Sequence, residues 1–309
     1  MELKLLEDFL CLSDLRSFSR SAEERNVTQS SLSKRIRALE QWVGAELVDR
    51  SCYPIALTAE GRAMLPQARE IVQAMNEMRA GVRSSDAPSD AVTFAALHTL
   101  LVTFMPVWRR RIEAVTGPLK IEPSRENSAY VQNVKMVQDG EVDFLLTYTH
   151  PRVPSGFDTS GLDVLTLGRE RVLPVSAPGP DGRPLHAIGG EKPIRYLSYG
   201  TASFFANALS VFFAERPLPL KVVAANSMSV GLQSMALVGC GLAWVPESLA
   251  AEDLAAGRLV LAGGEEWTLQ ADIELWRRRK RGRPVVERIW QVACDLSAER
   301  GLLHEAIVA

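Results

Sequence analysis

The chain has 309 residues, 47% of them hydrophobic and 23% charged, and its formal net charge at pH 7 is −2. This composition is ordinary for a globular protein, and the length suits about two domains. It excludes a disordered chain and a chain that is basic throughout, so any nucleic-acid footprint has to be local.

Sequence patterns of secretion, metal binding and catalysis are missing. The first ten residues hold acids within their apolar run, and no stretch of about 18 uncharged apolar residues occurs. The four cysteines show neither C-x-x-C nor zinc spacing. Glycine-rich nucleotide motifs, H-E-x-x-H and G-x-S-x-G are absent as well. We therefore expect a cytoplasmic protein that is not an enzyme and has no metal, no cofactor and no membrane partner.

A helical pattern dominates the first part of the chain. Apolar residues at helical spacing begin at Leu3, and a short second helix ends near Arg25. Asn26 suits a tight turn, because asparagine tolerates left-handed backbone. Thr28 can cap a third helix that runs to about Trp42.

The third helix is the main functional signal. Its apolar face predicts packing of Leu32, Ile36, Leu39 and Val43, while the opposite face is polar. Residues 16–37 hold six basic and two acidic side chains, a local charge of six minus two, or +4. Any amphipathic surface helix has a polar face, but the short helix and turn before this one favour a DNA-reading helix-turn-helix. The expected DNA contacts are Ser19, Gln29, Ser30, Ser33, Lys34, Arg37 and Arg50.

A wing and a long helix follow. Extended pieces at 47–50 and 55–57 predict a two-stranded wing, and Thr58 can cap a helix that runs to about Arg83. This helix carries a heptad stripe that a lone helix cannot bury. Its partner is either the same helix of a second subunit, which a palindromic DNA site favours, or the DNA-binding module. The stripe, and thus the expected dimerisation surface, comprises Met64, Ala68, Ile71, Met75, Met78 and Val82.

Strands alternate with helices beyond the polar stretch 84–90, which is a hinge by composition. Thr99–Val115 is expected to be one helix and Arg171–Ser176 a strand. This rhythm predicts a parallel sheet covered by helices. The basic run 277–283 is expected to be a solvated loop before the last helix rather than a DNA contact.

The stretch FSRSAEERNVTQSSLSKRIRALEQWVGAELVDR, followed by LTAEG, resembles the LysR-type transcriptional regulators, and GCGLAWVPES extends the likeness toward the second half. The resemblance implies an N-terminal all-α winged helix-turn-helix with a long linker helix, followed by a two-subdomain α/β periplasmic-binding-protein-like domain. It also implies a homodimer or homotetramer on double-stranded promoter DNA, with a small-molecule effector in the cleft. The sequence departs from the family pattern at Ser30, where proline is common. It also departs in the wing, whose only basic side chain is Arg50, and this argues against strong insertion of the wing into the minor groove.

The domain boundaries follow from the same resemblance. The DNA-binding domain would be 1–58, the dimerising linker helix 59–84 and the hinge 85–90. The effector-binding domain would be 91–309, with subdomain I at 91–165 plus 272–309 and subdomain II at 166–271.

The effector site is expected where strands end and helices begin, because ligands of two-lobed α/β folds bind there. Ordinary caps and turns would look the same residue by residue. The apolar balance suggests a ligand with an apolar body and one anionic end, such as an aromatic or organic acid. The expected contacts are His98, Thr99, Leu100, Asn127, Thr147, Tyr199, Thr201, Phe204, Asn226, Met228 and Val245.

Two alternatives stay open. The second half bears a fainter resemblance to hypochlorite-responsive members of the family, which implies sensing by methionine oxidation. The candidates would be Met105, Met136, Met228 and Met235. The other alternative is a solute-binding α/β protein that binds no DNA and whose helical N-terminus only dimerises it.

Overall fold

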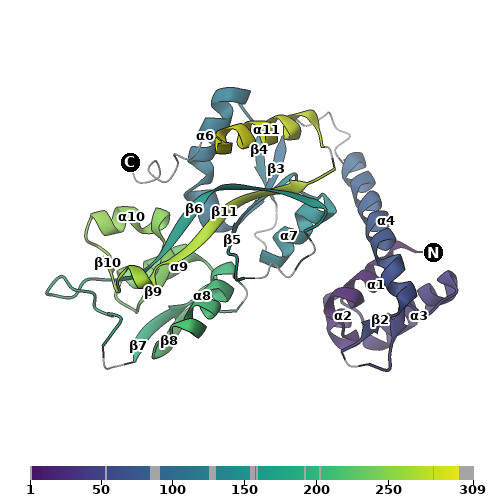
Figure 1. The fold of residues 1–309 in the computed structure, drawn as a ribbon, viewed down its shortest axis with the longest axis horizontal. Helices are drawn as coiled ribbons and strands as arrows, with labels where there is room; N and C mark the ends of the chain where they lie inside the picture. Colours follow the sequence, from purple (N-terminus) through teal and green to yellow (C-terminus); the bar gives the residue numbers. More distant parts are fainter. Residues whose placement is uncertain are drawn as a thin grey trace. The chain divides into compact units, whose positions relative to one another are not determined.

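The computed structural model describes residues 2–52, 54–83, 91–124, 130–153, 157, 159–190, 193–201, 203–280 and 282–298. It forms two compact units, Met1–Pro88 and Ser89–Ala309. Both units are drawn in Figure 1. The expected hinge at 85–90 lies outside the described residues. Within the described part, no helix is long and apolar enough to cross a membrane.

Local sequence signals set the helices of the first unit. Ser17 and Thr28 accept hydrogen bonds from the backbone N–H groups of Arg20 and Ser31, and so cap the second and third helices. Asn26 has a φ of 51°, which confirms the expected turn. The elements are α1 (Leu3–Leu15), α2 (Phe18–Glu24), α3 (Gln29–Val43), β1 (Val48–Asp49), β2 (Ala56–Leu57) and α4 (Ala59–Arg83).

One core holds the first unit together. Leu32, Ile36 and Leu39 of α3 are fully buried, as predicted, but Val43 is 36% exposed and does not belong to this face. The other members come from α1, β1 and the start of α4. Gly61 is required where α4 meets Leu47, because a Cβ there would lie 2.1 Å from the Leu47 carbonyl oxygen.

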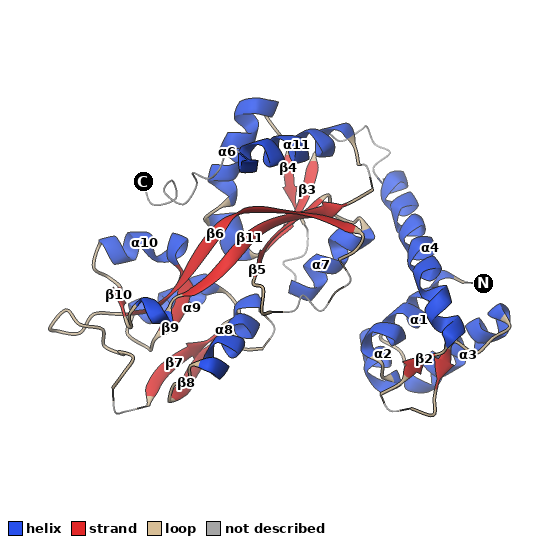
Figure 2. Cartoon of the chain, viewed as in Figure 1, coloured by secondary structure: helices blue, strands red, loops and turns tan. Residues whose placement is uncertain are grey.

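The second unit is built on a mixed sheet in which two neighbouring strands, β6 (Leu162–Ser176) and β11 (Leu269–Arg278), are long (Figure 2). These two strands pair antiparallel, and the full strand order is β10-β6-β11-β5-β3-β4, with β9 also on β6. Among the described strands, β3 pairs in parallel with β4 and β5, and β7 with β8, and an isolated parallel bridge joins Tyr196 to Leu242. The expectation of a parallel sheet is thus correct for part of the unit. The remaining strands are β3 (Val92–Ala96), β4 (Ile121–Pro123), β5 (Phe144–Thr149), β7 (Ile194–Ser198), β8 (Leu220–Ala225), β9 (Ala243–Pro246) and β10 (Val260–Leu261).

Helices cover both faces of this sheet. Phe94 and Phe144 share a core with Trp108 and Ile289 on one face, while the alternate residue Ala95 packs with α7 on the other. The expected helix 99–115 is broken, because a continuous helix would press the ring of Pro106 against the carbonyl of Val102. The helices are α5 (His98–Val102), α6 (Met105–Thr116), α7 (Tyr130–Asp139), α8 (Phe204–Glu215), α9 (Ser229–Leu237), α10 (Glu247–Ala255) and α11 (Pro284–Ala298).

The expected subdomain boundaries, 165/166 and 271/272, both fall inside the long strands β6 and β11. The two halves of this unit are therefore joined by continuous, paired backbone rather than by loops.

Candidate DNA-binding interface and sensing site

The polar side of α3 is presented to solvent. Gln29, Ser30, Lys34 and Arg37 are exposed and Ser33 is half-buried, opposite the buried leucine and isoleucine side chains. Ser19, exposed on α2, donates a 3.3 Å hydrogen bond to Oε1 of Gln29. The structure therefore brings the expected contacts of α2 and α3 onto one accessible surface, where amide, hydroxyl and cationic groups can reach base edges and phosphates.

A fully buried acid in α1 organises this surface, and the sequence analysis missed it. Asp8 accepts hydrogen bonds from Nε of Arg25 at 2.8 Å and from Nη1 of Arg35 at 3.2 Å, and Arg25 also reaches Glu7 at 2.6 Å. Two of the six basic residues in 16–37 are thus paired with acids of α1. The local charge available to DNA is smaller than the sequence count suggests, and it is concentrated on residues such as Lys34 and Arg37.

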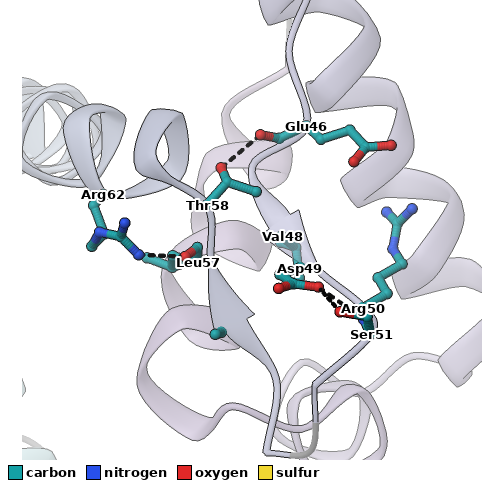
Figure 3. A pocket seen from close by; sticks show the side chains of 9 residues that line it. Glu46, Val48, Asp49, Arg50, Ser51, Leu57, Thr58 and Arg62 are labelled. Atoms are coloured by element: carbon teal, nitrogen blue, oxygen red, sulfur yellow. Dashed lines mark hydrogen bonds between the residues drawn. The ribbon is translucent and has the colours of Figure 1, made fainter.

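The wing is a short antiparallel ladder in which Val48 pairs with Leu57 and Asp49 with Ala56. Beside it lies a hollow of about 540 Å³ (Figure 3). The Asp49 carboxylate in this hollow accepts hydrogen bonds from the hydroxyl and the backbone N–H of Ser51, and these bonds lower its pKa. Among the nine lining residues are two arginines, Arg50 from the end of β1 and Arg62 from the first turns of α4.

The heptad stripe of α4 divides into two parts. Ala68 is fully buried and Met64 half-buried, and both pack on the core of their own unit. Ile71, Met75 and Met78 are 45%, 37% and 55% exposed. The side chain of Val82 lies outside the described part. The DNA-binding module therefore covers the start of the stripe, and Ala68 cannot serve as a contact to a second subunit.

Several expected effector residues of the second unit are buried together. Thr99, Leu100, Thr147, Tyr199, Phe204 and Val245 are all buried. The ring of Phe204 lies 6.2 Å from that of Tyr148, which contacts Phe205 at 4.9 Å, and Phe205 lies 5.3 Å from Tyr199. Tyr148, Tyr199, Phe204 and Phe205 thus form an aromatic cluster, in which the two tyrosine hydroxyls are the polar groups.

The remaining expected residues differ in exposure. Thr201 and Met228 are exposed, and Asn226 accepts a hydrogen bond from the backbone N–H of Met228, which is a turn-forming role. His98 is half-buried, and its Nδ1 atom is buried without a hydrogen-bond partner among the residues that the structure describes. Asn127 lies outside the described residues.

A buried carboxylate that is hydrogen-bonded to Tyr148 of this cluster was not anticipated. Glu170 of β6 accepts hydrogen bonds from the Tyr148 hydroxyl at 3.4 Å, and from the backbone N–H and the hydroxyl of Ser248 at 3.1 and 2.5 Å. Burial raises the pKa of Glu170 above its usual range. Burial, followed by the charge of Glu170, also raises the pKa of Tyr148. The sequence gives one local sign of this residue, because Glu170 is an acid two positions before the buried stretch 172–176 of β6.

Helix α7 contributes Tyr130 to the border of the aromatic cluster and also carries a buried amide. Tyr130 lies 6.1 Å from Phe204, and burial, with the charge of Glu274, raises its pKa to about 12. One helical turn later, Asn133 is 2% exposed and its Nδ2 atom has no hydrogen-bond partner in the described structure. An unmade bond at a buried amide is costly, so such a group is a natural contact for a ligand or an ordered water.

The basic run 277–283 begins inside a strand and then becomes the exposed loop that the sequence suggested, since residues 279, 280, 282 and 283 are exposed and lie outside helices and strands. Strand β11 continues to Arg278, and the side chain of Arg277 is only 12% exposed. Arg277 bonds to Asp163 at 3.3 Å and to Glu287 at 2.9 Å, and its guanidinium lies over the ring of Trp290. The charge of Arg277 is therefore neutralised by Asp163 on the neighbouring strand β6 and by Glu287 on α11.

Comparison with known proteins gives matches over most of the chain. The family model described as bacterial regulatory helix-turn-helix protein, lysR family, matches residues 3–62, and the LysR substrate binding domain matches residues 85–296. The transcriptional regulator YjiE of Escherichia coli K12 is 29% identical over 301 residues, which cover 96% of this chain and 95% of YjiE.

Two solved structures are similar over nearly their whole length. Vibrio fischeri DarR, solved in complex with DNA, matches with a TM-score of 0.59 and 28% identity, covering 96% of this chain and 99% of DarR. Full-length HypT of Salmonella typhimurium, described as a hypochlorite-specific LysR-type transcriptional regulator, matches with the same TM-score, identity and coverage.

Proposed function

Because this chain belongs to the LysR family of transcriptional regulators, we propose that it binds promoter DNA through α3 and the wing, as a homodimer or homotetramer, and that an effector in the second unit alters this binding. The relatives are regulators rather than enzymes. The observation that carries the DNA-binding part is the exposed polar face of α3 above a fully buried apolar face. Such a regulator acts in the cytoplasm, where promoter DNA is found.

A genome-wide pull-down with the purified full chain tests this function. We expect a short list of promoters, one of them beside the protein's own gene, and each should contain a near-palindrome that matches a two-fold dimer. Lys34→Ala and Arg37→Ala should weaken binding and flatten its salt dependence, because each lost phosphate contact reduces the slope by about 0.9.

The matched control is Arg183→Ala, which removes an exposed cation of the second unit. It should bind DNA as the wild type does. Absence of any enriched promoter would favour the alternative of a solute-binding protein, in which the N-terminal unit has no DNA to read.

The dimer is proposed to form through the exposed part of α4. Ile71, Met75 and Met78 present apolar side chains in successive helical turns, and they are 45%, 37% and 55% exposed in the described part of their own unit. A second copy of the same helix offers the complementary apolar stripe, since a two-fold axis pairs like with like.

The effector is proposed to contact the aromatic cluster of the second unit. The rings of Phe204 and Tyr130 lie 6.1 Å apart, and His98 Nδ1 and Asn133 Nδ2 are buried polar atoms without a hydrogen-bond partner in the described structure. The sequence suggested an anionic end on this ligand. Glu170, bound to Tyr148, disfavours a carboxylate placed beside that tyrosine, so we propose an aromatic effector whose head there is neutral or cationic.

Three ligands with the same ring separate these possibilities. Thermal-shift measurements with benzoate, benzamide and benzylamine keep the ring constant and make its substituent anionic, neutral or cationic. We expect stabilisation by benzamide or benzylamine and not by benzoate, and Glu170→Gln should remove the discrimination. Stabilisation by benzoate alone would restore the aromatic acid that the sequence suggested, and no shift with any of them would count against an aromatic effector.

Oxidant sensing is a second candidate function, favoured by one observation and one likeness. Met228 is 43% exposed at the start of α9, next to the turn made by Asn226, whereas Met105 and Met136 are buried. HypT, which this chain resembles, is described as hypochlorite-specific. Repeating the pull-down after mild hypochlorite treatment, with Met228→Leu as control, tests it: an altered promoter list that Met228→Leu abolishes would support methionine oxidation.

A further inference from the structure

The carboxylate of Glu40 joins α3, the proposed DNA-reading helix, to the wing. Glu40 lies near the end of α3 and is only 7% exposed. Its Oε1 accepts hydrogen bonds from the backbone N–H groups of Leu47 at 3.1 Å and Val48 at 3.2 Å. Its Oε2 accepts a 2.6 Å hydrogen bond from Nη2 of Arg50. One side chain of the reading helix thus holds both the backbone at the start of the wing and the wing's arginine.

The same stretch of backbone is tied to α4 from its other side. The carbonyl of Leu47 accepts the backbone N–H of Thr58 at 3.1 Å, and the Thr58 hydroxyl donates to the carbonyl of Glu46 at 2.6 Å. The close approach at Gly61 lies at this point too. Glu40 therefore acts where three elements meet, so its loss would release the wing from α3 while its contacts with α4 remain.

A second acid of the wing, Asp49, could compete with Glu40 for Arg50, but its carboxylate is hydrogen-bonded to Ser51. Asp49 precedes Arg50 in sequence, and it accepts hydrogen bonds from the hydroxyl and the backbone N–H of Ser51, which lower its pKa. Figure 3 shows Asp49 bonded to Ser51, with Arg50 reaching elsewhere. The guanidinium of Arg50 has five N–H donors in a planar fork, and its bond to Glu40 engages one of its nitrogens, so other N–H groups remain for a phosphate.

We propose that Glu40 is a positioning residue for DNA binding, which sets the wing against the reading helix and fixes the Arg50 guanidinium at a backbone phosphate. The proposal rests on the function proposed above, since it takes the wing to contact DNA. It predicts an effect opposite in sign to that of simple electrostatics. Removing a negative charge near DNA should by itself strengthen binding, whereas removing this one should weaken it.

The test uses the full chain, the fragment upstream of the protein's own gene and a random duplex of equal length. Glu40→Gln keeps one oxygen to accept from Leu47 and Val48 but loses the charge that holds Arg50. The matched control is Glu46→Gln, which makes the same change at an exposed acid of the same hollow. We expect Glu40→Gln to weaken binding about tenfold, as loss of one charge-assisted hydrogen bond would, while Glu46→Gln binds as tightly as the wild type or more tightly.

Salt dependence separates positioning from a merely structural role. Arg50→Gln should lower the slope of log K against log salt by about 0.9, for one lost phosphate. Glu40→Gln should lower it equally, and the double variant should lose no more than either single variant. Arg50→Lys keeps the charge but cannot bridge acid and phosphate in one plane, so it should also lose affinity. This variant serves if Glu40→Gln does not fold.

The remaining outcomes overturn the proposal. Positioning by Glu40 would be refuted if Glu40→Gln bound DNA as tightly as Glu46→Gln does. It would also be refuted if the effects of Glu40→Gln and Arg50→Gln added in the double variant, or if Glu40→Gln lowered the melting temperature but left the salt slope unchanged. If Lys34→Ala still weakens binding in those cases, the proposed function stands and only this inference fails. A wild-type chain that binds neither duplex would overturn both.

Discussion

The Nε–H of Arg25 donates a 2.8 Å hydrogen bond to Oδ1 of Asp8, a carboxylate of α1 with no exposed surface. The other oxygen of Asp8 receives Arg35 of the reading helix. The helix-turn-helix is therefore fixed from behind by one acid that holds the end of α2 and the middle of α3 in a single arrangement. Its role is structural, because the acid has no surface to offer to DNA.

Replacing this acid should destabilise the first unit. Asp8→Asn leaves two arginines facing a neutral amide, and we expect a loss of about 2 to 3 kcal/mol, as for other broken buried charge pairs. Hydrogen exchange of the α3 amides in the full chain measures it. Glu7→Gln, at a more exposed partner of Arg25, should cost under about 1 kcal/mol. Equal effects of both variants would show that burial of Asp8 does not matter.

Two residues of α3 that share one predicted face should behave differently. Ile36 is fully buried, so Ile36→Ala should cost about 2 to 4 kcal/mol, whereas Val43→Ala, at a residue 36% exposed, should cost under about 1 kcal/mol. The free energy of exchange of the α3 amides reports both. A large loss in Val43→Ala would mean that Val43 is covered in solution, for example by a second copy of the chain.

The contrast between these residues shows what sequence can predict. Thr28, Asn26 and Gly44 act on their own backbone, so the bounds of α3 follow from local chemistry. Val43 fits the helical period, but the helix outlasts the core that it packs on, and period alone does not reveal where a neighbour ends. The bonds of Asp8 join residues 17 and 27 positions apart, and no local pattern specifies such pairs.

The second unit shows the same limit at longer range. The aromatic residues at the start of α8 suggested a site, and the structure does place Phe204 and Phe205 beside Tyr148. Glu170 is noticeable in the sequence as an acid near the apolar half of β6, but its place in this cluster could not be predicted, because its partners Tyr148 and Ser248 lie 22 and 78 residues away in other elements. The length of β6 was likewise underestimated, since its first half alternates between polar and apolar residues while only its second half is continuously buried.

Glu170 should make the stability of the second unit depend on pH. Its folded-state pKa is raised, chiefly by burial, so the folded chain holds this proton more tightly than the unfolded chain does. Stability is then greatest below the unfolded pKa and falls as the pH rises through the folded one. We expect Glu170→Gln to lose less stability than the wild type between pH 4.5 and neutrality, as chemical denaturation at a series of pH values would show.

A suitable control for that series is Glu113→Gln, because hydrogen bonds, first from the Leu119 backbone and then from Arg109, lower the pKa of Glu113. A lowered folded pKa has the opposite sign, so Glu113 contributes stability above the unfolded pKa and loses it as the pH falls. The two variants should therefore shift the pH profile in opposite directions. Parallel shifts would indicate that overall charge, and not the surroundings of each acid, controls the profile.

The division of the α4 stripe predicts two separable defects. Met78→Asp places a charge on an apolar side chain that is 55% exposed, so it should leave the first unit folded and dissociate the proposed dimer. Ala68→Asp introduces the same charge at a fully buried site on the same helix, so it should unfold the unit instead. Sedimentation equilibrium gives the mass and circular dichroism the helix content. A Met78→Asp chain that remains a dimer would show that Met78 lies outside the contact between subunits. A folded Ala68→Asp chain would show that α4 can leave the core of its own unit, in which case the whole stripe becomes available to a partner.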